Sequence, residues 1–256
     1  MLRAGIVRPP AATFAMGITA AGLGPPILEL ALEQHEAYVR ALEACGLKPI
    51  RLDPDPQHPD STFVEDAAVI APGGALLTRP GAPSRRGEVD SLRGALQGVF
   101  PRLRAIDPPG TLDGGDVCEA GPHFFIGLSD RTNESGARQL ADFLAEDGCT
   151  SALIDIRGMA GVLHLKSGMA ALGERRLVAI DALAGHAAFR GYDVVRVSTE
   201  ESYAANCVAV NGSLLVAAGF PSLERTLRGL GYSILPLEMS EFRKMDGGLS
   251  CLSLRL

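Results

Sequence analysis

The chain lacks the features that mark several large classes of protein. None of its apolar stretches approaches the roughly 20 residues that a membrane-spanning helix needs. Prolines interrupt residues 1–17 before a long apolar region forms, so this start is a poor match to a secretory signal peptide. The net charge of −6 disfavours nucleic acid as the main partner, because such binding normally requires a broad basic surface. We therefore expect neither a membrane nor a nucleic acid as partner.

Paired cysteines and nucleotide-binding motifs are also missing. The five cysteines are odd in number and scattered, without a C-x-x-C pair. This pattern indicates free thiols in a reducing compartment rather than a disulfide framework or a structural zinc site, and cytoplasm is the simplest localisation. No G-x-G-x-x-G or P-loop sequence occurs between a strand and a helix, which disfavours a Rossmann-like nucleotide site.

What the sequence does contain is a pattern that occurs four times. Its anchors are spaced 50, 51 and 39 residues apart and are Asp66, Asp116, Ser167 and Asn206. A turn signal follows each anchor, and ten residues after the anchors come the apolar residues Leu76, Ile126, Leu177 and Val216. Periods of this length are typical of propellers, solenoids and arrays.

The clearest copy, residues 116–156, predicts a unit of strand, strand, helix and strand. Residues 116–129 form two strands around a Gly-Pro turn, residues 131–148 have the three-to-four spacing of a helix, and residues 151–156 form a third strand. The N-terminal part offers a strand, a helix and a strand but lacks one opening strand, which residues 249–256 would supply. We expect an α/β fold in which five such units close into a ring, as a single domain over residues 1–256.

Equivalent ends of the units would face the axis of this ring, and several polar residues fall there. These residues are Glu65, Asp66, Asp113, Asp116 and His164, with Cys251 in the closing fragment. Carboxylates set among apolar residues and glycines need cationic partners or hydrogen bonds. His164 is the sole imidazole beside them and an oxygen-rich cation loop is missing, so a cationic substrate fits better than a metal.

His164 and Cys251 stand out from the other histidines and cysteines only by their expected position. A lone histidine in an apolar segment is usually a core residue, and a cysteine is usually a small buried hydrophobe. We assign that ordinary role to Cys45, Cys118, Cys149 and Cys207, and no axial position to His35, His58, His123 and His186. A cysteine and a histidine that are distant in sequence but meet in space can act as nucleophile and acid–base pair.

Arginines occupy corresponding places on two adjacent units. Arg85 and Arg86 precede one predicted helix, and Arg131 precedes the next. Guanidinium groups bind carboxylates through two parallel hydrogen bonds, so these side chains could form a carboxylate-binding rim. The implied ligand is positive at its deep end and carboxylated at its outer end, like an arginine-type amino acid.

The chain resembles dimethylarginine dimethylaminohydrolases, members of the pentein superfamily of guanidine-modifying enzymes. The matching segments are 58–69, 78–88, 110–117, 126–139, 162–168, 200–211 and 240–256. The resemblance implies a five-bladed α/β-propeller, the pentein fold, around a central channel. It also implies hydrolysis of asymmetric dimethylarginine or monomethylarginine to citrulline plus dimethylamine or methylamine, through a covalent cysteine thiouronium intermediate and without a metal or cofactor.

The resemblance also implies a role for each matching residue. Cys251 matches the nucleophile, His164 the general acid–base, and Asp113 an acidic residue that supports the histidine and is glutamate in some relatives. The carboxylates that grip the guanidinium are Glu65 and Asp66, and the residues that hold the amino-acid end are Asp60, Arg85 and Arg131. Residues 11–24 match a mobile lid.

Two alternatives stay open. Arginine deimination or amidino transfer could run on the same fold, because arginine and its methylated forms differ only by small apolar groups. Arginine deiminases carry an extra helical domain, however, and amidinotransferases are longer. A non-catalytic ring-shaped binding protein would not need Cys251, His164 and the acidic cluster together. The expected partner is a small molecule, a methylated arginine, and a homodimer is a further expectation.

Overall fold

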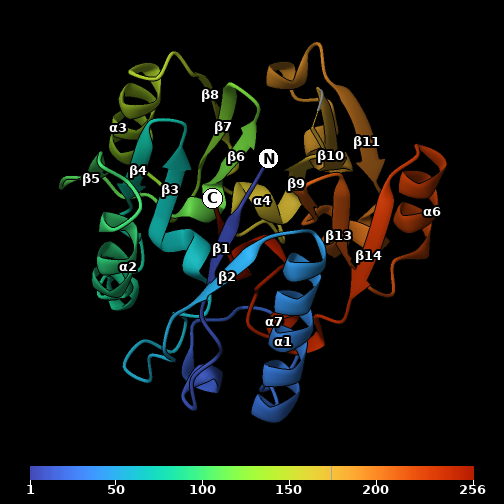
Figure 1. Ribbon diagram of the computed structural model, residues 1–256. Coiled ribbons are helices and arrows are strands. Elements are labelled where there is room, and N and C mark those ends of the chain that lie inside the picture. The colour runs from blue at the N-terminus through green and yellow to red at the C-terminus, as the bar shows by residue number, and fades with distance from the viewer. Residues whose placement is uncertain (174) are drawn as a thin grey trace.

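Five small sheets of three strands each are arranged around a common centre in the computed structural model (Figure 1). The structure describes residues 1–173 and 175–256. Within each sheet the first two strands pair antiparallel and the second and third pair parallel. This is the predicted ββαβ unit, repeated five times as a five-bladed α/β-propeller.

The second unit runs through β3 (Ala68–Ala71), β4 (Gly74–Leu77), α2 (Glu88–Gln97) and β5 (Leu103–Ala105). The third runs through β6 (Val117–Ala120), β7 (His123–Leu128), α3 (Glu134–Ala145) and β8 (Thr150–Asp155). The fourth runs through β9 (Met169–Ala171), β10 (Arg176–Ile180), α5 (Asp181–Ala184), η5 (Ala187–Phe189) and β11 (Asp193–Val197). The fifth runs through β12 (Val208–Val210), β13 (Ser213–Ala217), α6 (Pro221–Gly229) and β14 (Ser233–Leu237), and α7 (Ser240–Arg243) follows it.

The first unit is assembled from both ends of the chain. Its strands are β15 (Leu254–Arg255), β1 (Ala4–Val7) and β2 (Lys48–Arg51), and α1 (Leu28–Ala44) joins the last two. β15 pairs antiparallel with β1, and the Arg3 N–H donates to the Leu256 carbonyl at 2.6 Å. Figure 1 shows both termini near the middle of the molecule, with α1, α2, α3 and α6 around the rim.

Some local expectations needed correction. The helix predicted from residue 131 begins at Glu134, because the Asn133 side chain accepts from the Gly136 N–H and caps it. The short helix expected through His186 is two pieces, α5 and η5, with His186 between them. His123, expected in a loop, is the first residue of β7.

A short helical turn precedes the first strand of every unit, and the strand pattern did not predict it. We call these segments the central turns: η2 (Val64–Ala67), η4 (Gly114–Asp116), α4 (Leu165–Gly168), η6 (Thr199–Ala205) and η7 (Ser250–Leu252). Neighbouring turns touch, η7 with η2, η2 with η4, η4 with α4, and α4 with η6. The sequence anchors therefore lie in or beside these turns rather than at strand starts.

Hydrogen bonds from three of the four anchors join one central turn to the next. Asp66 Oδ1 accepts from the Gly115 N–H at 2.8 Å, and Asp116 Oδ1 accepts from the Leu165 N–H at 2.9 Å. Asn206 Oδ1 accepts from the Ser250 N–H at 2.9 Å. Ser167 differs, because its hydroxyl accepts within its own turn, from the His164 N–H. In three of the four copies, the anchor residue therefore links two neighbouring central turns.

The apolar core is divided among the junctions between units. Five buried clusters each combine residues of two neighbouring units, as Ile6 and Leu77 do between the first and second. Apolar burial, the main favourable term in folding, therefore closes the ring as well as filling each unit. Across residues 1–173 and 175–256, every helix is too short or too polar to span a bilayer.

Candidate active site

A small cavity at the centre of the ring is lined by six of the eight site residues that the sequence indicated. The space inside it is about 350 Å³, including open solvent, and the six are Asp60, Asp66, Arg85, Arg131, His164 and Cys251. We call this cavity the charged compartment. Its residues come from several units and from η7, so only closure of the ring brings them together. Asp113 contacts this cavity through His164, whereas Glu65 lies elsewhere.

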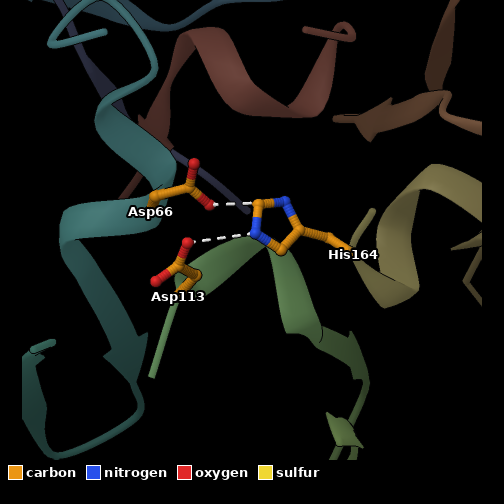
Figure 2. A group of neighbouring side chains, drawn as sticks. All are labelled: Asp66, Asp113 and His164. Carbon is orange, nitrogen blue, oxygen red and sulfur yellow. Dashed lines mark hydrogen bonds and ion pairs between the residues drawn. The ribbon is translucent and has the colours of Figure 1, made fainter. Parts of the chain in front are cut away.

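His164 stands directly before α4 and points its ring at two carboxylates (Figure 2). Nε2 lies 3.1 Å from Asp113 Oδ2, and Nδ1 lies 4.0 Å from Asp66 Oδ1. Burial disfavours the charged ring, but Asp66, Asp116 and Asp113 outweigh it and raise the His164 pKa to about 9. The imidazole is therefore protonated at neutral pH and can donate a proton.

Asp113 is fully buried and held from two sides. Its Oδ1 accepts from the Gly81 N–H at 2.9 Å, and its own N–H donates to Thr132 Oγ1 at 3.1 Å. Although an aspartate reaches less far than a glutamate, Asp113 lies within hydrogen-bond distance of the imidazole. This arrangement fixes the orientation of the His164 ring.

Asp66 is buried between a guanidinium and the imidazole. Its Oδ2 pairs with Arg85 Nη1 at 2.6 Å. Burial works against ionisation, but His164, Arg85 and the Gly115 N–H lower the Asp66 pKa to about 2. Gly115 is required here, because a Cβ on it would lie 2.7 Å from His164 Nδ1 and 2.8 Å from Asp66 Oδ1. Asp66 is thus held in its charged form beside the acid–base candidate.

Arg85 is largely saturated by the protein itself. Besides Asp66, it donates through Nε and Nη2 to the Glu88 carboxylate and through Nη2 to the carbonyls of Asp60 and Phe63. One Nη1 hydrogen remains for a ligand. Sequence reasoning missed Glu88, a buried carboxylate on α2, and its position three residues after Arg85 was the available signal.

Arg131 and Asp60 also line the charged compartment. Among the described residues the one ion pair of Arg131 is with Asp113, at 4.0 Å, and its side chain is 15 % exposed. Asp60 is buried, which raises its pKa despite the nearby Arg85, and both its oxygens accept from the Ile18 N–H at 3.1 Å. A group with both a cationic and an anionic part fits this pair of charges.

Cys251 lies in η7, half-buried, with the Gly248 N–H 3.5 Å from its sulfur. Burial, Glu65 and Asp66 raise the pKa of the thiol to about 12. The site without substrate therefore combines a neutral thiol with an imidazolium. Gly248 permits the close approach of this turn, because a Cβ there would lie 2.6 Å from the Asn206 amide.

The expected lid is folded down over the charged compartment. Phe14 anchors it in the core against Phe63 and Phe242. Further along, the Ile18 N–H donates to Asp60, and the Ala20 N–H donates to Asp246 Oδ2 at 2.6 Å. The lid thus contacts two residues that line the compartment, Asp60 and Asp246, through backbone N–H groups, and the Thr19 hydroxyl adds a bond to Asp246 Oδ2 at 3.1 Å.

A second, larger cavity opens from the same reactive pair. It contains about 1650 Å³ of empty space, including open solvent, and we call it the open compartment. Its lining includes His164 and Cys251, together with Ser202 and Tyr203 of η6 and Leu23 of the lid. The thiol and the imidazole therefore stand at the boundary between a small charged space and a large open one.

Glu65 lines a third cavity, on another side of the central turns. Its Oε1 pairs with Lys166 Nζ at 2.6 Å and with Arg255 Nη2 at 3.3 Å, and its Oε2 accepts from the Ser250 hydroxyl at 2.7 Å. The sequence placed Glu65 beside Asp66 in the substrate pocket, but the two carboxylates line different cavities. Lys166, a charged residue in an apolar segment two positions after His164, was the missed signal.

One group of side chains has the spacing of a metal site. Ligand atoms of Asp66, Asp113 and His164 lie within 4.8 Å of one another. Arg85 already pairs with Asp66, and Asp66 and Asp113 stabilise the protonated form of His164 and so raise its pKa. These charges suit proton transfer and cation binding.

The repeated fold and the site together define the class of protein. A five-bladed propeller that gathers a cysteine, a histidine and paired carboxylates at its centre is a pentein, a guanidine-modifying type of enzyme. No family model matches the chain. It is 41% identical over 251 residues, 98% of each chain, to the N(G),N(G)-dimethylarginine dimethylaminohydrolase of Pseudomonas aeruginosa. It is 37% identical over 231 residues to the enzyme of that name from Streptomyces coelicolor, covering 89% of this chain and 86% of the relative.

A solved structure of the Pseudomonas aeruginosa enzyme agrees with this assignment. It superposes with a TM-score of 0.96 and covers 100% of both chains at 40% identity. The chain belongs to the dimethylarginine dimethylaminohydrolase family.

Proposed function

We propose that the protein hydrolyses asymmetric dimethylarginine or monomethylarginine to citrulline and releases dimethylamine or methylamine. One observation carries the proposal: a thiol, a protonated imidazole and the charged Asp66 border a single cavity that Arg131 and Asp60 also line. In the family, a cysteine-to-serine variant of the Pseudomonas aeruginosa enzyme has been solved in complex with citrulline. A histidine-to-glycine variant forms an adduct with S-methyl-L-thiocitrulline.

The charges of the compartment match the substrate end by end. Asp66 faces the guanidinium, Arg131 binds the α-carboxylate, and Asp60 binds the α-ammonium. Arg85 has one free N–H, so its main task is to hold Asp66 in place and its contact with the substrate is secondary. Glu65 adds negative charge from the neighbouring cavity. The dimethylated nitrogen then faces the open compartment, which gives the released amine a way out.

The first half-reaction transfers the amidino carbon to sulfur. Binding of the cationic substrate lowers the pKa of the Cys251 thiol, which releases its proton to water. The thiolate attacks the guanidinium carbon, and a C–S bond forms in a tetrahedral adduct. His164 gives its proton to the methylated nitrogen as the C–N bond breaks, because an unprotonated amine is too poor a leaving group. A cationic thiouronium on Cys251 remains.

The second half-reaction restores the enzyme. Neutral His164 takes a proton from water, and the hydroxide adds to the thiouronium carbon. The C–S bond then breaks and the thiolate of Cys251 leaves. The product oxygen passes one proton to this thiolate, which gives citrulline and the neutral thiol. His164 ends protonated as it began, so one histidine serves as acid and then as base. Asp113 keeps the ring in the same orientation through both steps.

Side-by-side assays of citrulline formation test the proposal and its main rival. Arginine, monomethylarginine and asymmetric dimethylarginine are given to the purified protein at equal concentrations. We expect the methylated substrates to be turned over with release of the corresponding amine. Citrulline formation from arginine alone would instead establish a deiminase, and no turnover of any of the three would favour a binding protein.

Two further expectations stay predictions from the sequence. Sedimentation equilibrium at micromolar concentration checks the homodimer, and a monomer would contradict it. Fractionation of the source cells checks the cytoplasmic location.

A further inference from the structure

The side chain of Asn206 makes three hydrogen bonds at the point where three central turns meet. Its Oδ1 accepts from the Ser250 N–H at 2.9 Å. Its Nδ2 donates to the Lys166 carbonyl at 2.8 Å and to the Ser250 hydroxyl at 3.1 Å. Both amide hydrogens are therefore used inside the protein, and the residue is 7% exposed.

These bonds connect the two halves of the reactive pair. Lys166 belongs to α4, whose first residue directly follows His164, and Ser250 belongs to η7 and directly precedes Cys251. Asn206 thus bridges the backbone that carries the imidazole and the backbone that carries the thiol. Through the Ser250 hydroxyl, which donates to Glu65 Oε2, the same network reaches a further central turn.

The packing around the amide leaves it little freedom. Gly248 lies so close that a Cβ there would be 2.6 Å from both Cγ and Oδ1 of Asn206. A side chain with saturated hydrogen bonds and close neighbours fixes the groups it contacts. Reacting groups must be held within about half an ångström of the productive geometry, and a 1 Å misplacement can cost about 100-fold in rate.

We propose that Asn206 is a positioning residue that sets the placement of Cys251 relative to His164. The inference rests on the proposed function for its kinetic part. Because both donors of the amide are occupied, Asn206 acts through the two turns rather than on the substrate. Asn206 is also the anchor that precedes the fifth unit. At this junction the contact made by the anchor therefore affects catalysis as well as structure.

The substitution Asn206→Asp tests the bridge with almost no change in size. A carboxylate oxygen then faces the Lys166 carbonyl, two acceptors meet without a hydrogen, and the link to α4 is lost. The matched control is Asn211→Asp. Asn211 also makes three hydrogen bonds, to the N–H and carbonyl of Leu2 and to the Cys45 carbonyl, but it lies outside the site.

Three measurements on the purified variants separate positioning from stability. We expect Asn206→Asp to lower kcat for asymmetric dimethylarginine about 100-fold while KM changes less than about 3-fold. Alkylation of Cys251 by 2-chloroacetamidine should slow by about 10-fold, because its rate depends on the position and surroundings of the thiol and does not require turnover. Asn211 is exposed, so Asn211→Asp should lower the melting temperature no more than Asn206→Asp does, and it should leave both rates within about 2-fold of the parent protein.

The pH dependence of kcat in Asn206→Asp is a further measurement, and a mere loss of stability would not change it. Once the carboxyl group introduced at position 206 is protonated, it regains one donor, so the ratio of the variant's kcat to that of the parent protein should rise as pH falls. If Asn206→Asp does not fold, Asn206→Ser replaces it, because a serine is too short to span both turns. Normal kcat and normal alkylation in a folded Asn206 variant would overturn the inference. If the parent protein turns over none of the arginines, the proposed function fails, and the alkylation measurement still decides the role of Asn206.

Discussion

Glu65 and Asp66 are adjacent in the chain and equally buried, and each carries a carboxylate, yet they face different cavities with different partners. Asp66 shares the charged compartment with His164, whose proton can be exchanged, and with Arg85, which Glu88 of α2 anchors. Glu65 instead forms ion pairs with a lysine and an arginine, Lys166 and Arg255. Asp66 therefore affects the protonation of the acid–base candidate, whereas Glu65 links segments that close the ring.

The groups that pair with a buried carboxylate therefore decide its role more than the carboxylate itself does. Asp66 raises the pKa of His164 to about 9 together with Asp116 and Asp113. Glu65, by contrast, closes the ring where η7 meets η2, through the Ser250 hydroxyl.

The largest effect is expected at the thiol that both carboxylates surround. Cys251→Ser should lower kcat by about 10⁴-fold or more, because a serine hydroxyl without a strong base cannot replace the thiolate. Substrate binding should persist, since the charged compartment is intact. Turnover comes from steady-state assays and affinity from calorimetry; full activity in this variant would remove the nucleophile assignment.

Neutralising each acid in turn tests the contrast directly. Asp66→Asn should lower kcat about 100-fold, because the His164 pKa falls and the guanidinium loses its partner. Glu65→Gln leaves two largely buried cations without their carboxylate and should cost about 3 kcal/mol of unfolding free energy, with a smaller loss of kcat. Urea unfolding and steady-state kinetics on both variants supply the data. If Glu65→Gln lowered kcat more than Asp66→Asn, the two carboxylates would not have the different roles described above.

The free energy of unfolding should depend on pH through His164, the titratable partner of Asp66. The folded-state pKa of His164 is about 9 and its ordinary value is 6.5, so its contribution is fully present below pH 6.5 and is lost as pH rises through 9. We expect a loss of about 1–3 kcal/mol over this window, given roughly 1.4 kcal/mol per pKa unit and partial relaxation of the site. His164→Gln is the control and should show a flatter curve. An equally steep loss in the variant would assign the effect to other groups.

The smallest effect concerns the charge of the attacking reagent. With a thiol pKa of about 12, neutral 2-chloroacetamide should alkylate Cys251 slowly at pH 7, with a rate that rises about tenfold per pH unit up to pH 9. Cationic 2-chloroacetamidine should react at least about tenfold faster at pH 7, because the surrounding carboxylates attract it and its charge favours the thiolate. Equal rates for the two reagents would show that the negative lining does not act on the thiol.

Much of the fold could be predicted from the sequence because it depends on local patterns. A hairpin, a helix and a strand recur at a nearly constant period, and each copy contains its own turn signals. The central turns escaped prediction because three- to seven-residue helical segments carry no periodicity of their own. The meeting of six predicted residues in one cavity followed from ring closure.

The remaining features depend on contacts between distant segments. Sequence alone could not assign Glu65 and Asp66 to different cavities, because both sit in η2 with similar neighbours. The saturation of Arg85 by Glu88, and the bridge from Asn206 to Lys166 and Ser250, appear only once the units pack together. A repeated polar anchor can be recognised from sequence, but its hydrogen-bond partners cannot.

Trapping the covalent intermediate tests most directly whether Cys251 and His164 act on one carbon at the axis of the ring. Asymmetric dimethylarginine is mixed with the protein, the reaction is quenched in acid within one turnover, and the peptides are analysed by mass spectrometry. We predict a mass increase on the Cys251 peptide equal to the substrate less dimethylamine. Turnover to citrulline with no adduct on Cys251 at any time, or with the adduct on another residue, would contradict the account.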